Sequence, residues 1–559
     1  MYSNKKNVLQ LVSLLKAHEI QQIVISPGSR NSPIVHSLTS DSDFICHSVV
    51  DERSAGFYAL GISLYSGMPV AVCCTSGSAV LNYGPSVAEA FYQKVPLVYI
   101  TADRPASRIG QGENQTIPQP GIFGDLVKKS VQLPEVNTFE DEWYCNRLIN
   151  EALLGMYHLE CGPVHINVPL SEPLYEYTVE KLPHVREIHH CIPWDPSSLI
   201  DQATFFNTYA LELHKYNKVM LIVGQSFAID SAQFIEKFVD RFDCVVLTEH
   251  LSYMDPKFFI RNFDALINSL PLEKWEDYAP DLLITMGGHI VSKRIGQLLC
   301  KFPPKSHWHF SPSGEIRDTY QCLKEVIQCN GLTFFDYLSN IKLKRKKTFH
   351  KLWESTSIRL PEPSPEYSDL MAVGKLINAL PKKCTLHLAN SSSVRLGELF
   401  SLKNHIRVFA NRGTSGIDGC LSTAIGQASV TDNLTFVVIG DLAFFYDMNI
   451  LWNRRLPKGL RILLNNNGGG EIFYTLPGFE KSEASEEFIV AANSTSAKAW
   501  AETMGLTYLS VTNEEELKQN MPVFVEAGGV FSKPILMEVF TSAEKNVEIL
   551  ENYYQSIKL

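Results

Sequence analysis

Short apolar runs alternate with helix-length segments along almost the whole chain, and this alternation restricts the possible folds more than any other feature of the sequence. Each run has the length of one strand and ends in small or polar residues. Regular alternation of this kind is typical of parallel sheets wound with helices on both faces, so we expect an α/β fold. The runs are residues 21–28, 68–77, 96–103, 218–226, 243–250, 281–288, 384–391, 434–441, 460–467 and 534–541.

Two softer stretches, residues 179–198 and 342–368, interrupt the alternation and are rich in proline or charge. A chain of 559 residues is expected to hold about three or four domains of ordinary size. We therefore predict three doubly wound domains with parallel sheets. Their expected ranges are 1–183, 184–350 and 351–559.

The first and last thirds of the chain resemble one another. In each, an apolar run leads through a helical stretch to a second run with a polar end. Gly77 and Asp103 are 26 positions apart, and so are Asp441 and Asn467. A shared strand, turn, helix and strand unit would produce this match, although chance spacing in an α/β chain is an alternative.

The most informative polar groups follow two of these runs, at Asp441 and at the stretch of three asparagines and three glycines from Asn465 to Gly470. Neighbouring parallel strands would bring both ends to one edge of a sheet. Carboxylate and amide oxygens suit magnesium or calcium shared with phosphate oxygens, while glycines allow close approach of a ligand. A simple turn and a flexible loop are the alternative. The presence of a carboxylate, amides and glycines at two neighbouring strand ends nevertheless favours a site for a metal-bound diphosphate.

Other polar groups also follow predicted strands. Arg30 lies just after Pro27 and Gly28, where a helix N-terminus could bind an anion, although a solvated arginine beside a capping residue fits equally well. Asp51 and Glu52 precede a helix of small residues, so they are either a helix cap or a buried proton relay. The sequence alone does not decide between these roles.

Composition excludes several functional classes. A net charge of −10 argues against general binding to nucleic acids or anionic membranes. The first 20 residues predict a helix, not a signal peptide, because Lys16, His18 and Glu19 interrupt the apolar pattern. Twelve scattered cysteines without CxxC spacing suit a reducing compartment. We therefore expect a cytoplasmic protein.

Taken in order, these motifs resemble the thiamine-diphosphate-dependent enzymes over nearly the whole chain. Within that family they are most similar to a branch that serves menaquinone biosynthesis, for which residues 112–115 and 411–419 are the most specific. The matching segments are residues 26–33, 51–61, 75–80, 101–105, 112–121, 411–419 and 440–449. Leu442 stands where the general family motif has a glycine, but this branch of the family has the same GDL sequence.

The resemblance implies a pyrimidine-binding domain, a central α/β domain and a diphosphate-binding domain. It also implies a homodimer, or a dimer of dimers, with active sites between subunits, and thiamine diphosphate with Mg²⁺ or Mn²⁺ as cofactors. The implied metal ligands are Asp441, Asn467 and the carbonyl of Gly469, although the extra asparagine leaves Asn466 with Gly468 open.

The resemblance further implies roles for individual residues. Glu52 would bind the aminopyrimidine ring, and Ile417 would bend the cofactor so that its reacting atoms meet. The implied cofactor contacts are Glu52, Asn390, Ser391, Gly416, Ile417, Gly440, Asp441, Leu442, Ala443, Asn467, Gly469 and Gly470. The implied substrate contacts are Ser29, Arg30, Arg104, Asn114, Gln115, Lys293, Arg294, Ser391, Arg395, Arg412, Ile472 and Phe473.

The implied activity is decarboxylation of 2-oxoglutarate and addition of the resulting succinyl-semialdehyde carbanion to isochorismate. Both substrates are dicarboxylates, so arginines would be needed to bind their four carboxylates even though the protein is acidic overall. The alternatives are another thiamine enzyme acting on a 2-oxo acid and a binding protein that has lost catalysis. Isolated His36 and His47 argue against the first, since many such decarboxylases carry a histidine pair, and the presence of Glu52 and Asp441 argues against the second.

Three expectations rest on less specific patterns. Lys293 and Arg294 could instead begin an ordinary surface helix, although a substrate contact is the preferred interpretation. Glu471 receives no role. Residues 476–488 are acidic and carry serines, so a mobile lid is conceivable, but a solvated loop is the preferred interpretation.

Overall fold

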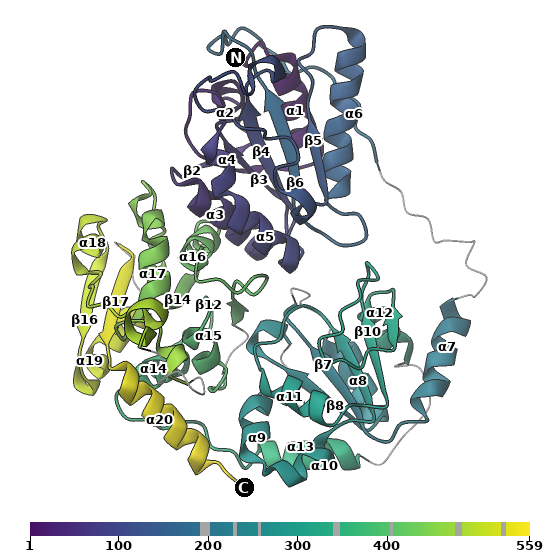
Figure 1. Cartoon of the computed structure of the whole chain (residues 1–559), viewed down its shortest axis with the longest axis vertical. Coiled ribbons are helices and arrows are strands. Elements are labelled where there is room, and N and C mark those ends of the chain that lie inside the picture. Colours follow the sequence, from purple (N-terminus) through teal and green to yellow (C-terminus); the bar gives the residue numbers. More distant parts are fainter. Residues whose placement is uncertain are drawn as a thin grey trace.

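The computed structural model describes residues 1–189, 202–226, 232–254, 259–338, 347–402, 406–475, 483–526 and 533–559. It contains three sheets with interleaved helices, and every strand pair in them is parallel. The predicted α/β fold is therefore confirmed. In Figure 1 the N-terminal domain lies at the top, the C-terminal domain at the lower left and the central domain at the lower right.

The N-terminal sheet has six strands in the order β2-β1-β3-β4-β6-β5. Its strands are β1 (Gln22–Ile25), β2 (Ile45–Ser48), β3 (Val70–Cys74), β4 (Leu97–Asp103), β5 (Lys129–Gln132) and β6 (Val164–Pro169). Its helices are α1 (Lys6–Ala17), α2 (Ser32–Thr39), α3 (Glu52–Ser66), α4 (Ser78–Asn82), α5 (Gly84–Gln93) and α6 (Phe139–Gly155), with short 3-10 turns at Ala106–Arg108 and Gly124–Leu126. The predicted first helix is thus present as α1.

The central sheet has five strands in the order β11-β10-β9-β7-β8. Its strands are β7 (Val219–Val223), β8 (Cys244–Thr248), β9 (Leu282–Met286), β10 (Ser306–Phe310) and β11 (Glu325–Ile327). Its helices are α7 (Gln202–Leu213), α8 (Ala232–Arg241), α9 (Phe263–Ser269), α10 (Trp275–Tyr278), α11 (Arg294–Lys301), α12 (Gly331–Leu338) and α13 (Thr348–Ser357), with 3-10 turns at His250–Ser252 and Leu272–Lys274.

The C-terminal sheet has six strands in the order β13-β12-β14-β15-β17-β16. Its strands are β12 (Cys384–Leu388), β13 (Arg407–Phe409), β14 (Leu434–Gly440), β15 (Leu460–Asn466), β16 (Thr507–Val511) and β17 (Ile535–Phe540). Its helices are α14 (Asp369–Ala379), α15 (Ser392–Gly397), α16 (Cys420–Ala428), α17 (Asp441–Asp447), α18 (Lys498–Thr503), α19 (Glu514–Val525) and α20 (Ala543–Ser556), with 3-10 turns at Met448–Trp452 and Glu471–Thr475 and a π-helix at Ser485–Val490.

The resemblance between the first and last thirds of the sequence corresponds to a shared topology. Numbered within its own domain, each six-stranded sheet has the order 2-1-3-4-6-5, and the central sheet, read from β8, begins in the same way with 2-1-3-4-5. The matched spacing therefore reflects equivalent strand, helix and strand units, β3 to β4 and β14 to β15. Chance spacing is not the explanation.

The first domain boundary expected from the sequence, near residue 183, borders a stretch of which residues 190–201 lie outside the described residues. The second lies inside a helix. Helix α13 spans residue 350, and its fully buried Trp353 belongs to a core formed by the central domain. We therefore propose the end of α13, instead of residue 350, as the boundary between the central and C-terminal domains.

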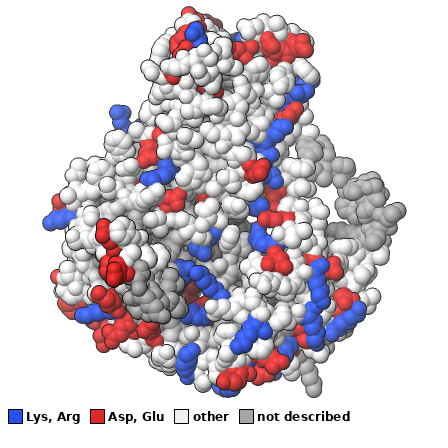
Figure 2. All heavy atoms as spheres, viewed as in Figure 1, with Lys and Arg blue, Asp and Glu red and all other residues white. Residues whose placement is uncertain are grey.

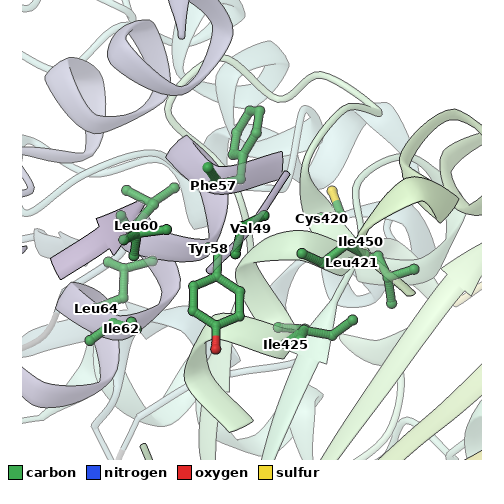
Figure 3. Close-up of a cluster of buried hydrophobic side chains, with 14 of the residues drawn as sticks. Val49, Phe57, Tyr58, Leu60, Ile62, Leu64, Cys420, Leu421, Ile425 and Ile450 are labelled. Atoms are coloured by element: carbon green, nitrogen blue, oxygen red, sulfur yellow. The ribbon is translucent and has the colours of Figure 1, made fainter. Parts of the chain in front are cut away.

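The N-terminal and C-terminal domains share one hydrophobic core, whose centre is the contact between α3 and α16 (Figure 3). Glycines bring the two helix backbones unusually close. A Cβ atom on Gly61 would lie 1.9 Å from the carbonyl oxygen of Thr423, and one on Gly426 would lie 2.1 Å from that of Tyr58. Only glycine fits at either position without moving a helix.

The central domain meets the C-terminal domain through buried polar groups. The backbone N–H of His250 donates to Glu398 at 3.0 Å, and its imidazole donates to the carbonyl of Phe400 at 2.9 Å. Glu249 accepts from the backbone N–H groups of Val291 and Ser292 at 2.7 and 2.8 Å. Burial raises the pKa of Glu249 and Glu398 to about 8, and for Glu249 the nearby charge of Glu398 adds to this effect.

Among the described residues, none of the helices has both the length and the apolar character that crossing a membrane would require. The eleven cysteines in the described ranges are free thiols, which agrees with the absence of a disulfide pattern in the sequence.

The close helix contact can be tested with Gly61→Ala and Gly426→Ala. Either methyl would collide with a backbone carbonyl, so we expect a cost at the upper end of the usual overpacking range of about 1–3 kcal/mol. Thermal unfolding should show a clearly lower melting temperature than for Gly84→Ala, because no atom lies within 4 Å of the position that a Cβ would take there. Equal melting temperatures for the three variants would contradict the contact.

The glutamates at the central junction predict a pH effect on stability. Because the folded protein raises the pKa of Glu249 and Glu398 to about 8, it holds protons that the unfolded chain has released. The free energy of unfolding should therefore fall as the pH rises from the ordinary glutamate range through about 8.

Substituting Glu398→Gln removes one of these titrating groups while keeping an acceptor oxygen for His250. We expect a shallower decline of melting temperature with rising pH than in the wild type. Glu502→Gln, at an exposed position of α18, is the matched control and should leave the pH profile unchanged. If the melting temperature of Glu398→Gln fell as steeply with pH as that of the wild type, Glu249 and Glu398 would not be the cause of the decline.

Candidate functional site

The two strand ends that the sequence predicted to meet are neighbours in the C-terminal sheet. Strands β14 and β15 pair in parallel, and Gly440 is in register with Asn465. Asp441 begins α17 directly after β14, while Asn467 follows the end of β15. The carboxylate and the asparagines therefore emerge at the same edge of one sheet.

Asp441 is buried, and its carboxylate receives hydrogen bonds from Leu442, Asn493 and the backbone of Gly468. One oxygen accepts from the backbone N–H of Leu442 at 2.7 Å, and the other accepts from the side chain of Asn493 at 3.3 Å. Burial raises the pKa of Asp441 to about 6, and the negative charge of Asp369 contributes. Because burial outweighs these donors and disfavours the free charge, the carboxylate is well suited to a cation.

The three asparagines differ in what their side chains contact. The amide nitrogen of Asn466 donates to the carbonyl of Thr495 at 2.7 Å and to Glu538 at 2.8 Å. By contrast, the amide oxygens of Asn465 and Asn467 are buried and have no hydrogen-bond partner among the described residues. An unpaired buried oxygen is costly unless a ligand uses it, so these two atoms fit a metal or a donor group.

Two carboxyl groups fix the orientation of the Asn467 amide. Its nitrogen donates to Asp369 at 2.9 Å and to Glu471 at 2.6 Å, which leaves the amide oxygen directed away from them. Asn546 on α20 also donates to Glu471, at 2.7 Å. Burial and the charge of Asp369 raise the pKa of Glu471 to about 9. Sequence reasoning gave Glu471 no role and missed Asp369 and Asn546, because no motif marks them.

The glycines after Asn467 adopt conformations that other residues avoid. Gly468 has φ of 86° and Gly469 has φ of 150°. A Cβ atom on Gly469 would lie 2.8 Å from a methyl carbon of Val490, so the loop packs tightly against the π-helix. Gly470 donates to the carbonyl of Val490 at 2.7 Å. These contacts hold the loop close to the strand end, as a phosphate- or metal-binding loop requires.

Glu52 is the first residue of α3 and is half-buried at the C-terminal edge of the N-terminal sheet. Burial raises its pKa, and the charge of Asp51 adds to this. Asp51 is the helix cap, since its carboxylate accepts from the backbone N–H of Ser54 at 3.2 Å. The capping interpretation therefore applies to Asp51 and leaves the carboxylate of Glu52 available for a ligand.

The segment around Glu52 contacts the helix that begins at Asp441. Arg53 donates to the carbonyl of Tyr446 at 2.5 Å and lies over its ring at 4.4 Å. Asn449 donates to Asp51 at 3.0 Å. Among the described residues, no hydrogen bond or ion pair joins Glu52 itself to Asp441 or Asn467.

In the N-terminal domain, the predicted polar residues form two small groups. Arg30 is buried and not solvated: it donates to the carbonyl of Leu170 at 3.0 Å and pairs with Glu172 at 2.9 Å. Arg104 pairs with Glu113 at 3.0 Å and donates to the carbonyl of Asn114 at 3.1 Å. Ser29, Asn114 and Gln115 are exposed, and Gln115 has a positive φ of 54°.

In the C-terminal domain, Asn390 joins two segments that the sequence had singled out. Its amide nitrogen donates to the carbonyls of Asn411 and Gly416 at 2.6 and 2.7 Å, and its oxygen accepts from Arg412 at 2.8 Å. Arg412 is buried, and its Nε has no partner among the described residues. Ser391 has a strained φ of 70°, a feature that is frequent at binding sites.

Three predicted arginines gather where the central and C-terminal domains meet. Burial and the charge of Arg412 lower the pKa of Arg395, so these two guanidinium groups are electrostatic neighbours. Arg294 pairs with Asp264 at 2.5 Å and lies over the ring of Tyr554 at 4.5 Å. The negative charge of Asp264 also favours the protonated form of Arg395 and partly offsets the lowering of its pKa. Lys293 is exposed at the start of α11.

Acidic and basic side chains are mixed on the face shown in Figure 2, and several basic ones lie where the two lower domains meet. The apolar residues predicted for the site lie on the C-terminal domain. Ile417 is 39% exposed in the loop before α16. Beside Asp441, a cavity of about 480 Å³ is lined by Leu442, Phe445, Met448, Asn493, Thr495, Ser496, Ala499 and Trp500.

The other predicted contacts lie in the loops that border this edge. Gly440 and Ala443 flank the Asp441 turn, and Gly416 precedes Ile417. Ile472 and Phe473 are partly buried in the 3-10 turn after the glycines. Of the conceivable lid at 476–488, residues 476–482 lie outside the described residues.

Comparisons with known proteins identify the family that this chain resembles. A family model described as thiamine pyrophosphate enzyme, N-terminal TPP binding domain, matches residues 8–122. Proteins named 2-succinyl-5-enolpyruvyl-6-hydroxy-3-cyclohexene-1-carboxylate synthase from Phocaeicola vulgatus and Bacteroides thetaiotaomicron are 50% identical over 561 and 559 residues, covering all of this chain and 99% and 100% of their own. One so named from Desulfotalea psychrophila is 36% identical over 548 residues, covering 97% of this chain and 99% of its own.

Identity of 50% along the full length of both chains is far beyond what a shared fold alone produces. The chain therefore belongs to the family of thiamine-pyrophosphate-dependent transferases named 2-succinyl-5-enolpyruvyl-6-hydroxy-3-cyclohexene-1-carboxylate synthases.

Proposed function

We propose that the protein decarboxylates 2-oxoglutarate and adds the resulting succinyl-semialdehyde unit to isochorismate, as a step of menaquinone biosynthesis. The observation that carries this proposal is the full-length identity to relatives named for the product of that reaction. The bound thiamine diphosphate would supply the nucleophilic carbon at which the carboxyl group is lost and the new bond is prepared.

The residues at the β14 and β15 ends fit the metal that would hold the diphosphate. Asp441 offers a buried carboxylate, Asn467 offers an amide oxygen without a partner among the described residues, and Gly469 offers a backbone carbonyl in the tight glycine loop. Hard oxygen ligands of this kind suit Mg²⁺ or Mn²⁺. The buried oxygen of Asn467, which has no partner among the described residues, supports its assignment. Contacts of the amide nitrogens do not separate the two residues, because Asn466 donates to Thr495 and Glu538 and Asn467 donates to Asp369 and Glu471.

Glu52 would act on the aminopyrimidine end of the cofactor. Its half-buried carboxyl group has a raised pKa, so it can hold a proton in a hydrogen bond to a ring nitrogen. The partly exposed Ile417 would contact the cofactor and help to hold its reacting atoms together. These residues position the cofactor and exclude water, while the carbon chemistry belongs to the cofactor itself.

The arginines would receive the four carboxylates of the two substrates. Arg412 has a free Nε and sits beside Arg395 and Arg294, while Arg30 and Arg104 lie at the edge of the N-terminal sheet. Guanidinium groups favour bidentate contacts with carboxylates. The internal partners Glu172, Glu113 and Asp264 would then hold these side chains in place until a substrate binds.

The protein is proposed to work as a homodimer or a dimer of dimers. Large apolar side chains such as Val50, Leu81, Tyr446 and Trp452 are 47 to 56% exposed in the single chain. They belong to the same two domains that carry Glu52 and Asp441. A second copy covering them would complete a site between subunits.

The reaction and the role of Glu52 can be tested together with Glu52→Gln. Because glutamine cannot exchange a proton with the pyrimidine ring, we expect turnover to fall by about 100-fold or more. The measurement is carbon dioxide release and isochorismate consumption with 2-oxoglutarate, thiamine diphosphate and Mg²⁺. Carbon dioxide release by the wild type that ignores isochorismate would indicate a simple decarboxylase instead.

The metal assignment can be tested by titrating Mn²⁺ in the presence of thiamine diphosphate and following its paramagnetic resonance signal. Asn467→Ala removes a proposed ligand, so we expect Mn²⁺ affinity to fall by at least the 10- to 100-fold known for weaker supporting contacts. Asn466→Ala is the matched control: it should lower thermal stability by removing one of the hydrogen bonds of Glu538, which keeps Ser496, Ala497 and Tyr508 as donors, while leaving the affinity nearly unchanged. The opposite pattern would make Asn466 the ligand.

A further inference from the structure

The loop that carries Arg412 and Ile417 is held by a carboxylate from another domain. Glu89 lies on α5 of the N-terminal domain and is only 1% exposed. Its Oε1 accepts from the backbone N–H of Gly413 at 2.7 Å. Its Oε2 accepts from both the backbone N–H and the hydroxyl of Thr414, each at 2.7 Å.

The two backbones also approach very closely at this point. A Cβ atom on Gly413 would lie 2.6 Å from the carbonyl oxygen of Glu89, so only glycine allows the contact. The loop therefore rests directly on α5. An electrostatic attraction between the Glu89 carboxylate and the loop would not require this backbone contact, because a carboxylate acts over several ångströms.

Glutamines from two domains complete the junction. Gln93, one turn after Glu89, donates to that carboxylate and, at 3.3 Å, to the carbonyl of Ala410. Gln225 of the central domain donates to the same carbonyl at 3.0 Å and to Gln93 at 3.3 Å. All three domains thus meet in a buried hydrogen-bonded cluster immediately before Arg412.

The other side of the loop is held from within the C-terminal domain. Asn390 binds the carbonyls of Asn411 and Gly416 and accepts from Arg412. The backbone between residues 411 and 416 is therefore fixed at both ends by Asn390 and in the middle by Glu89. This leaves the Arg412 side chain with an unpartnered Nε and leaves Ile417 partly exposed.

We propose that Glu89 is a positioning residue for the reaction: from the N-terminal domain it sets the place of Arg412, which receives a substrate carboxylate, and of Ile417, which supports the cofactor. The inference rests on the proposed function, since it assigns Glu89 to the same site. Displacing a substrate contact by about 1 Å can reduce the reaction rate about 100-fold. Holding the loop backbone in place can therefore outweigh the cost of burying the Glu89 carboxylate.

The test is Glu89→Gln. Glutamine keeps the size but offers only one acceptor oxygen, so the donors that faced the other oxygen lose their partner whichever way the amide turns. We expect KM for 2-oxoglutarate or isochorismate to rise about 10- to 100-fold, with a matching loss of affinity for glutarate, a dicarboxylate that cannot react. Glutarate binding is measured by calorimetry on the enzyme loaded with thiamine diphosphate and Mg²⁺.

Asp243→Asn is the matched control. Asp243 is also a buried carboxylate, and it accepts from the backbone N–H groups of Thr348 and Phe349 at 2.7 and 2.8 Å and from the Thr348 hydroxyl at 2.9 Å. It therefore makes the same kind of contact, but in the central domain and with a helix start. Its substitution should lower the melting temperature while leaving KM and glutarate affinity at wild-type values.

A second variant, Thr414→Val, removes only the hydroxyl donor and covers the case in which Glu89→Gln does not fold. It should change the same quantities in the same direction by a smaller factor. Wild-type KM and glutarate affinity in the folded variants, with only a lower melting temperature, would make Glu89 purely structural and overturn the proposal. Absence of turnover in the wild type would instead contradict the proposed function.

Discussion

The close contact between α3 and α16 is the interaction on which the arrangement of the predicted site depends. Glu52 begins α3, and Ile417 lies in the loop that leads into α16, so within one chain this contact joins the two segments that would contribute to cofactor sites between subunits. Gly61 and Gly426 let the helix backbones touch, and the core around them is common to both domains. Because a packed core does not deform gradually, this contact fixes the relation between the two loops.

Three buried carboxylates, Glu89, Glu249 and Asp243, each accept from backbone N–H groups of loops or helix starts. In the part of the chain that the structure describes, none of the three has an arginine or lysine within ion-pair distance. Backbone donors favour the charged form of a carboxylate without using a cation, although at Glu249 burial outweighs them and raises the pKa to about 8. Arg395 and Arg412 therefore remain beside the candidate site with guanidinium groups that a substrate carboxylate can still engage.

The sequence predicted the features that arise from local patterns. The ten apolar runs correspond to ten of the seventeen strands in the described ranges, and the repeated spacing from Gly77 and from Asp441 predicted a strand, helix and strand unit that both six-stranded sheets contain. It could not predict contacts between residues far apart in the chain. Asp264 and Tyr554 flank Arg294 from two domains, and Glu89 reaches a loop more than 300 positions away. Such partners are ordinary polar residues in their own segments, so no local signal distinguishes them from solvated ones.

The choice between Asn466 and Asn467, which the motif leaves open, depends on how each amide is held. Asn465 and Asn466 end β15 and point to opposite faces, while Asn467 lies just beyond the strand end. The nitrogens of both candidates are engaged: Asn466 donates to Glu538 of the neighbouring strand β17, and Asn467 donates to Asp369 and Glu471. Because an amide binds a metal through its oxygen, these nitrogen contacts orient the two oxygens without excluding either. The Asn467 oxygen is buried and has no hydrogen-bond partner among the described residues. That oxygen, together with the tight glycine loop directly after it, favours Asn467 as the proposed ligand.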